Sequence, residues 1–193
     1  NYSNMKLFLS SILIMLFYSC LTEPTSSCGV GYKNIDGECY SEIDIGVLQS
    51  IINNTSIPID VSLDINSNDT IEPLELQIQK WNEDGRLTYL WLYNLSLSGA
   101  IPENIGDLFF LDTLNLSYNE LSGSIPASLS KLENLNWLYL KLNNLSGTIP
   151  DTICHIYPNL NNISFAYNQI CPPYPECIPI QKIGAQDTTN CSN

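Results

Sequence analysis

The hexapeptide LSG-x-IP occurs three times in the chain, at Leu97–Pro102, Leu121–Pro126 and Leu145–Pro150. The copies follow one another at a fixed period of 24 residues. Self-similarity at a period of roughly 20–29 residues is typical of a solenoid, in which each repeat forms one turn and buries its apolar side chains against its neighbours. Solenoids present extended surfaces, so the pattern favours a binding or structural role over catalysis.

Each hexapeptide belongs to a longer frame, L-x-x-L-x-L-x-x-N-x-L-x-G-x-I-P-x-x-L-x-x-L. In the second copy Leu114 and Leu116 flank Asn115, and this alternation of apolar and polar residues is that of an extended strand. We expect the leucines to point into one continuous core and Asn115 to point outward. Stacked turns then form a parallel sheet on the concave face of an α/β-type solenoid. The frame spans Leu87–Phe110, Leu111–Asn134, Leu135–Asn159 and, in shortened form, Leu160–Ile170.

Two positions of the frame have a backbone role. An asparagine follows the strand, and its side-chain amide can satisfy backbone groups where the chain turns. The first copy has Leu95 there instead, a departure expected of a repeat at the edge of the array. The recurring glycine permits a backbone conformation that other residues avoid. The asparagines are Asn119, Asn143 and Asn168, and the glycines are Gly99, Gly123 and Gly147.

This frame resembles the plant-type subclass of leucine-rich repeats, which also occurs in secreted bacterial proteins. The resemblance extends from about Trp81 to Cys177. It implies a short repeat array at residues 87–170, entered through an amphipathic helix, Leu74–Trp81, that covers the open edge of the first repeat. Trp81 then fills the core at that junction, with a ligand contact as the other interpretation. The resemblance also implies a role in adhesion, recognition or inhibition of extracellular proteins or polymers.

The N-terminal residues have the layout of an export leader. After Met5 and Lys6, an apolar stretch runs from Leu7 to Tyr18 and ends at Ser19-Cys20. This stretch is too short to span a bilayer but suits a signal peptide. We expect residues 1–20 to be a leader and the protein to be secreted or exposed on the cell surface. Two interpretations of Cys20 remain open: it is discarded with the leader, or it is acylated as the first residue of an outer-membrane lipoprotein.

The chain has seven cysteines, and setting Cys20 aside leaves an even number, as expected of an exported, disulfide-bonded protein. Cys28 and Cys39 flank a short segment and are predicted to pair, closing an N-terminal segment at residues 21–42. The other four allow three pairings, among which the sequence does not choose. We expect them to staple a C-terminal cap, residues 171–193, over the last core edge. These four are Cys154, Cys171, Cys177 and Cys191.

The net charge limits the classes of partner. Twenty acidic residues against seven basic ones give a formal net charge of −13. Nucleic acid is therefore not an expected partner, because its phosphates need a basic surface. Charge also disfavours adhesion to an anionic bilayer, so membrane contact is expected only through a lipid on Cys20.

The stretch Asp64–Glu75, DINSNDTIEPLE, matches the spacing of the 12-residue EF-hand calcium loop. Alternating oxygen-bearing side chains closed by a glutamate suit Ca²⁺, which takes six to eight oxygen ligands. Asp69 stands where that loop normally has glycine, which counts against the match. The alternative is an Asx-rich turn that caps a helix beginning near Pro73, with Glu75 in its first turn. The predicted ligands of a structural Ca²⁺ are Asp64, Asn66, Asn68, Thr70, Glu72 and Glu75.

An EF-hand-like loop needs a helix on either side. Ile43–Ile52 is predicted as the entering helix and Leu74–Trp81 as the exiting one. Residues 43–86 are therefore expected to form a helical, EF-hand-like N-terminal cap on the first repeat.

Little in the sequence supports catalysis. His155 is the only histidine, so no histidine pair is available for a zinc site. The cysteine spacings are not those of zinc knuckles, and no glycine-rich phosphate-binding loop is present. We therefore predict a non-enzymatic protein without catalytic residues.

The outward positions of the predicted strands are rich in aromatic residues. Half of the tyrosines and tryptophans of the chain fall on this small surface. Amphipathic rings mixed with Asn, Ser and Thr suit an extended peptide, a protein or a sugar face. The alternative is that the rings only pack against one another across the turns. The predicted binding residues are Tyr89, Trp91, Tyr93, Tyr118, Trp137, Tyr139 and Tyr167.

These features favour an extracytoplasmic module that binds a protein, peptide or polysaccharide through its concave face. Two alternatives stay open: a structural surface protein that assembles with copies of itself, and an inhibitor of a secreted hydrolase. Fold-level likeness identifies none of these partners by itself.

Overall fold

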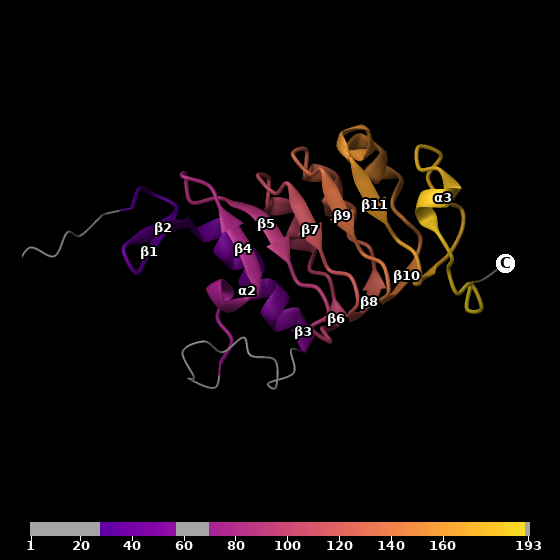
Figure 1. Cartoon of the computed structure of the whole chain (residues 1–193), viewed down its shortest axis with the longest axis horizontal. Helices are drawn as coiled ribbons and strands as arrows, with labels where there is room; N and C mark the ends of the chain where they lie inside the picture. The colour runs from indigo at the N-terminus through magenta and orange to yellow at the C-terminus, as the bar shows by residue number, and fades with distance from the viewer. Residues whose placement is uncertain (1–27, 57–69, 192–193) are drawn as a thin grey trace, which may run out of the picture.

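The computed structural model describes residues 28–56 and 70–191 of the 193-residue chain. The repeats stack side by side as turns of one solenoid, from the N-terminal elements in indigo to the C-terminal cap in yellow (Figure 1). The predicted α/β-type solenoid with a parallel sheet is confirmed. The predicted leader with Cys20 and the first half of the predicted calcium loop lie outside the described residues.

One five-stranded sheet lines the concave face, in the order β11-β9-β7-β5-β4. Neighbouring strands from β5 to β11 are parallel, as expected for stacked repeats. The edge strand β4 is antiparallel to β5 and was not predicted. The strands are β4 (Ile78–Trp81), β5 (Leu87–Trp91), β7 (Thr113–Asn115), β9 (Trp137–Tyr139) and β11 (Asn162–Ser164).

A second five-stranded sheet, in the order β12-β10-β8-β6-β3, is built largely from the hexapeptide and was also not predicted. Gly99 in β6 has φ +102°, and a Cβ there would overlap the carbonyl oxygen of Asn54. Glycine at this position therefore lets β3 pair with β6. The strands are β3 (Thr55–Ser56), β6 (Ser98–Ala100), β8 (Glu120–Ser124), β10 (Asn144–Gly147) and β12 (Gln169–Ile170).

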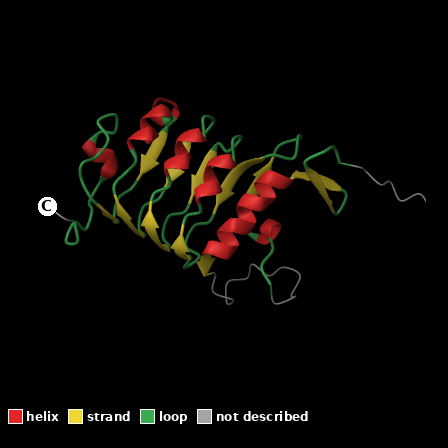
Figure 2. Ribbon diagram, turned by 180° about the vertical axis from the view of Figure 1, so that it is seen from behind, coloured by secondary structure: helices red, strands yellow, loops and turns green. Residues whose placement is uncertain are grey.

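Short 3-10 helices follow the Ile-Pro pair of each hexapeptide and lie on the side away from the concave sheet (Figure 2). The third repeat, Leu135–Asn159, is one residue longer than the first two, and a further 3-10 turn forms at its end. These elements are η2 (Glu103–Asp107), η3 (Ala127–Lys131), η4 (Asp151–His155) and η5 (Tyr157–Asn159).

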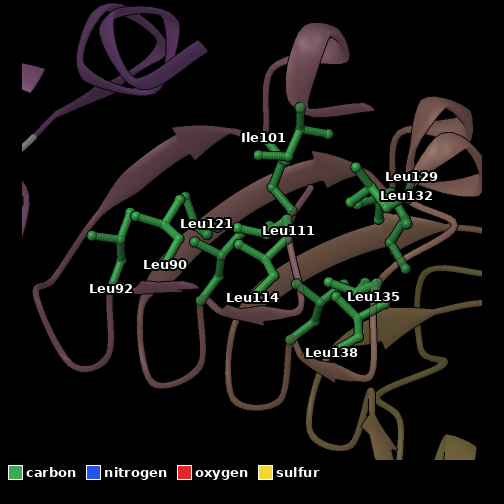
Figure 3. Close-up of a cluster of buried hydrophobic side chains, with 14 of the residues drawn as sticks. Leu90, Leu92, Ile101, Leu111, Leu114, Leu121, Leu129, Leu132, Leu135 and Leu138 are labelled. Atoms are coloured by element: carbon green, nitrogen blue, oxygen red, sulfur yellow. The ribbon is translucent and has the colours of Figure 1, made fainter. Parts of the chain in front are cut away.

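The core runs without interruption between the two sheets and the 3-10 helices (Figure 3). Leu90, Leu114 and Leu138 are paired residues of β5, β7 and β9, and all three are fully buried. The core thus consists of rows of leucines, each contributed by successive turns, as the frame predicts.

The asparagine position joins each repeat to the one before it. The Nδ2 of Asn143 donates to the carbonyl oxygens of Leu140 in its own turn (3.1 Å) and of Leu116 in the preceding turn (2.9 Å). Its Oδ1 accepts the backbone amide of Leu121, also in the preceding turn, at 3.0 Å. Asn119 and Asn168 bond in the same way. One amide therefore satisfies the backbone of two turns.

The helix α2 (Glu42–Asn54) covers the open edge of the first repeat and contains the predicted entering helix. Val47, Leu48 and Ile51 are buried in the core, and the Ser41 hydroxyl accepts the amide of Asp44 at 3.3 Å as an N-cap.

The predicted exiting helix, Leu74–Trp81, is wrong. A 3-10 turn, η1 (Pro73–Glu75), is followed by the strand β4. Gln77 has φ +31°, which no α-helix allows, and pairing with β5 satisfies the backbone groups of β4. The backbone groups at the free edge of β5 need hydrogen-bond partners, which a strand supplies and a helix does not. This tertiary pairing overrode the helical pattern of the local sequence. Trp81 packs against the core edge and contacts Tyr40 edge-on at 4.9 Å, as its interpretation as a core residue implies.

An ion pair fixes α2 to the first repeat. The carboxylate of Asp44, fully buried, accepts two hydrogen bonds from the Arg86 guanidinium, both at 2.9 Å. It also accepts the backbone amide of Leu87 at 2.8 Å. Hydrogen bonding to Asp44 raises the pKa of Arg86, and the guanidinium lies 4.5 Å from the ring centre of Phe110. This pair joins the cap to the start of β5.

Disulfides close both ends of the solenoid. Cys28 pairs with Cys39 across the hairpin of β1 (Tyr32–Ile35) and β2 (Glu38–Ser41), as predicted. At the other end the pairs are Cys154–Cys177 and Cys171–Cys191, which decides among the three open pairings. They hold the cap with α3 (Ile180–Ile183) on the last repeat, where Ile183 is buried.

We predict that Asn143→Ala lowers the free energy of unfolding by about 3 kcal/mol, because it leaves buried backbone groups of two turns without partners. The adjacent Asn144→Ala is a matched control, since Asn144 is exposed on the edge of the turn. It should change stability by less than about 0.5 kcal/mol. Urea unfolding followed by far-ultraviolet circular dichroism measures both, and equal effects would contradict the role of the asparagine.

We predict that Asp44→Asn, which keeps the side-chain shape, destabilises the chain by about 3 kcal/mol because it leaves Arg86 uncompensated. Asp84→Asn removes an exposed carboxylate from the neighbouring turn and should have an effect below about 0.5 kcal/mol. Thermal melts of the two variants make the comparison. If Asp44→Asn lowers the melting temperature no more than Asp84→Asn does, the Asp44–Arg86 ion pair is not what fixes α2.

Candidate binding surface

The aromatic surface consists of the seven residues Tyr89, Trp91, Tyr93, Tyr118, Trp137, Tyr139 and Tyr167. Strand register brings most of them into two rows across the concave sheet. In the first row Tyr89 of β5 pairs with Thr113 of β7, which pairs with Trp137 of β9. The second row runs from Trp91 through Asn115 to Tyr139. Small polar residues of β7 therefore lie between two columns of aromatic rings.

Six of the seven rings form one connected cluster. The ring of Trp91 lies 5.8 Å from that of Tyr89, 6.4 Å from that of Tyr93 and 6.3 Å from that of Tyr139, measured between ring centres. Tyr93 continues the cluster to Tyr118 at 4.9 Å, and Tyr139 continues it to Trp137 at 6.3 Å. Tyr167 makes no ring contact with another residue that the structure describes.

Packing and exposure coexist in this cluster. Tyr93 and Trp137 are each 37% exposed and Tyr118 is 38% exposed, while Tyr167, outside the cluster, is 62% exposed. The rings do pack against one another, as the alternative interpretation holds, yet more than a third of the surface of Tyr93, Tyr118 and Trp137 faces solvent. Mutual contacts order the rings in advance, so a partner that binds them loses less conformational entropy.

The central strand β7 departs from the expected pattern. Asn115 was expected to point outward, but it is buried, and so are Thr113 and Ser117. Asn115 lies in β7 between the strands that carry Trp91 and Tyr139, whose rings meet above it. Its Oδ1 accepts the amide of Ser117 at 2.9 Å. The aromatic columns of the flanking strands therefore cover this strand.

Polar groups and cations border the aromatic surface. Asn136 donates to the Asp112 carboxylate at 2.6 Å, and Asn161 donates to Asn136 at 3.1 Å. These bonds link one carboxylate and two amides just before the strands, a feature that the sequence pattern did not indicate. The ammonium groups of Lys80 and Lys141 lie 5.0 Å from the ring centres of Tyr89 and Tyr118, respectively. Burial raises the pKa of Tyr89, and its neighbour Tyr139 adds to the rise.

The predicted calcium site is described only in part. Asp64, Asn66 and Asn68 fall outside the described residues, whereas Thr70, Glu72 and Glu75 fall within them. The buried Glu75 accepts the amide of Glu72 at 2.9 Å, in a capping box around Pro73. Glu75 thus lies in the first turn of η1, as the alternative interpretation has it, but η1 is a 3-10 turn rather than a helix and its N-cap is Glu72. Within residues 28–56 and 70–191, no group of three or more His, Cys, Asp or Glu side chains is placed to hold a metal ion. Calcium binding stays a prediction.

The Leucine Rich Repeat family model matches residues 86–108, 110–132 and 134–156. The chain contains leucine-rich repeats. No curated protein sequence matches it. None of the helices in the described ranges is long and apolar enough to cross a membrane.

Solved leucine-rich repeat ectodomains share the fold. The ectodomain of the plant membrane receptor kinase GASSHO1/SCHENGEN3 from Arabidopsis thaliana, in complex with CASPARIAN STRIP INTEGRITY FACTOR 2, is 26% identical with a TM-score of 0.58. That match covers 74% of this chain and 16% of the receptor chain. The BIR3–SERK2 complex from Arabidopsis thaliana matches at 23% identity and TM-score 0.53, covering 75% of this chain and 93% of that one. The SOBIR1 ectodomain from Arabidopsis thaliana is 23% identical, with TM-score 0.51 and coverages of 76% and 90%.

If the calcium loop forms, Ca²⁺ should raise the melting temperature of the chain above its value in EDTA by about 5 °C, because the ion binds only the folded state. Glu75→Gln is the decisive variant, since glutamine still offers an oxygen to the Glu72 amide but is not a carboxylate. It should abolish the response to Ca²⁺ and leave the value in EDTA nearly unchanged. Equal melting temperatures of the unaltered chain in Ca²⁺ and EDTA would leave only the capping role.

Proposed function

We propose that this chain is an extracellular recognition module that binds a protein or peptide partner through its aromatic surface. One observation carries the proposal: six rings form a connected cluster on the concave sheet and still expose part of their area. Large, pre-ordered aromatic side chains are the residues that most often dominate binding energy at protein interfaces.

Two further observations support this proposal. Three disulfides suit an oxidising, extracellular compartment. The receptor ectodomain that is 26% identical was solved in complex with a partner, CASPARIAN STRIP INTEGRITY FACTOR 2. This chain spans only 16% of that receptor chain, so the comparison supports the class of function and not the identity of the partner.

We predict that the double substitution Trp91→Ala, Tyr139→Ala weakens binding about thirtyfold or more, because both residues lie at the centre of the ring cluster. A secreted, full-length preparation would be screened against arrays of peptides, proteins and polysaccharides, with affinities measured by biolayer interferometry. Phe109→Ala is the matched control, since Phe109 is 42% exposed but lies in a loop outside the concave sheet.

The outcomes separate the proposal from its alternatives. Loss of binding in the double variant with retention in Phe109→Ala supports recognition through the aromatic surface. Binding that survives the double substitution contradicts it. If no partner binds and the chain instead associates with itself in sedimentation experiments, the assembly alternative is favoured.

A further inference from the structure

The concave sheet is set apart from the rest of the chain by its charge. The chain has 20 acidic residues, yet none lies in β4, β5, β7, β9 or β11. Three of its seven basic residues, Lys80, Lys141 and Lys182, contact residues of the concave face. A strongly acidic protein therefore carries a local basic border around its aromatic surface.

Two of these lysines lie at opposite ends of one row of the sheet. Lys80 of β4 pairs with Tyr89, the first residue of the row that continues through Thr113 to Trp137. Trp137 pairs with Asn162 of β11, and the Lys182 ammonium donates to the Asn162 Oδ1 at 3.3 Å. The row crosses four strand spacings, or about 19 Å. An extended peptide covers that length in about six residues.

The three ammonium groups remain available to a ligand. The ion pairs among the described residues are Arg86–Asp44 and Lys131–Asp107, so neither involves Lys80, Lys141 or Lys182. Asp112 and Asp187 lie near the face, and each accepts hydrogen bonds from neighbouring groups. Asp112 accepts hydrogen bonds from Thr113 and Asn136.

At the C-terminal edge Asp187 lies near Tyr167, and its Oδ1 accepts both the hydroxyl and the backbone amide of Thr189. These bonds lower the pKa of Asp187. The negative charge of Asp187 interrupts the basic border beside Tyr167. An acidic ligand is therefore expected on the row between Lys80 and Lys182 rather than at Tyr167.

We propose that this row binds an extended acidic peptide, an inference that rests on the proposed function above. Carboxylates about six residues apart meet Lys80 and Lys182 in charge-assisted hydrogen bonds, and apolar or aromatic side chains between them lie on the rings. Lys141 offers a third contact beside Tyr118. Because charges on other faces are screened beyond about 8 Å at physiological salt, the lysines at the row decide the preference. Acidic residues on the other faces repel the same peptide and so disfavour its binding there.

The test uses short peptides with a common tyrosine-containing centre and Glu, Gln or Lys at two positions six residues apart. Affinity for the full-length, secreted chain is measured by fluorescence polarisation. The Glu peptide should bind about tenfold more tightly than the Gln peptide, and the Lys peptide least tightly. High salt should shrink these differences.

Charge reversal provides the matched comparison. Lys80→Glu with Lys182→Glu should reverse the order of the Glu and Lys peptides. Lys33→Glu with Lys131→Glu changes the net charge equally, away from the row, and should leave the order unchanged. If both double variants behave alike, the lysines at the row do not select the ligand.

Failure of this inference is distinguishable from failure of the proposed function. If the Glu and Gln peptides bind equally but Trp91→Ala, Tyr139→Ala abolishes binding, acidic selectivity is wrong and recognition by the aromatic surface stands. If peptides bind this aromatic variant as well as the unaltered chain, both are wrong. If no peptide binds while a polysaccharide does, a peptide is the wrong class of ligand.

Discussion

A single turn of this solenoid cannot bury its own leucines, and the whole structure depends on how one turn is joined to the next. Leu90, Leu114 and Leu138 are buried only because their strands pair in register. The asparagine amide adds a polar link where the chain leaves the concave strand, since it bonds the backbone of its own turn and that of the turn before it. Stability is therefore a property of neighbouring pairs of turns, and the two ends need separate solutions.

The ends of the array show those solutions. At the N-terminus α2 covers the core, β4 pairs with the exposed edge of β5, and the Asp44–Arg86 pair locks the helix to the repeat. At the C-terminus two disulfides hold the cap. Regular stacking between these ends brings side chains from successive turns into rows. The same register that aligns the leucines inside the solenoid aligns the aromatic rings outside it. The proposed binding surface is therefore a consequence of the repeat.

How much the sequence predicts depends on the range of the interaction. The frame repeats locally, so the strands, the role of Asn143 and the aromatic positions of the concave face followed from it. The second sheet did not follow from it, because the hexapeptide contains a glycine and glycine is disfavoured inside strands. The pairing of Asp44 with Arg86 joins residues 42 apart and has no sequence signature. Burial of Asn115 was missed because alternation gives the direction of a side chain but not what its neighbours cover.

The positions of the lysines in space could not be predicted from the sequence either. Net charge alone presents the chain as uniformly acidic, and only the register of β4, β5 and β9 shows that Lys80 and Lys182 border one row. A solvated acidic exterior with a basic, aromatic concave face is a division of roles between solubility and recognition. The proposed division would let a chain with a net charge of −13 select an acidic ligand.

The most direct test of recognition by the concave face is hydroxyl-radical footprinting of the full-length chain with and without its tightest-binding peptide, read by mass spectrometry. Our account predicts that bound peptide protects Tyr93, Tyr118 and Trp137, which are partly exposed in the free protein. Phe109, exposed outside the concave sheet, should be oxidised equally in both states. Protection of Phe109 with no change at the three concave residues would contradict the account and place the binding surface elsewhere.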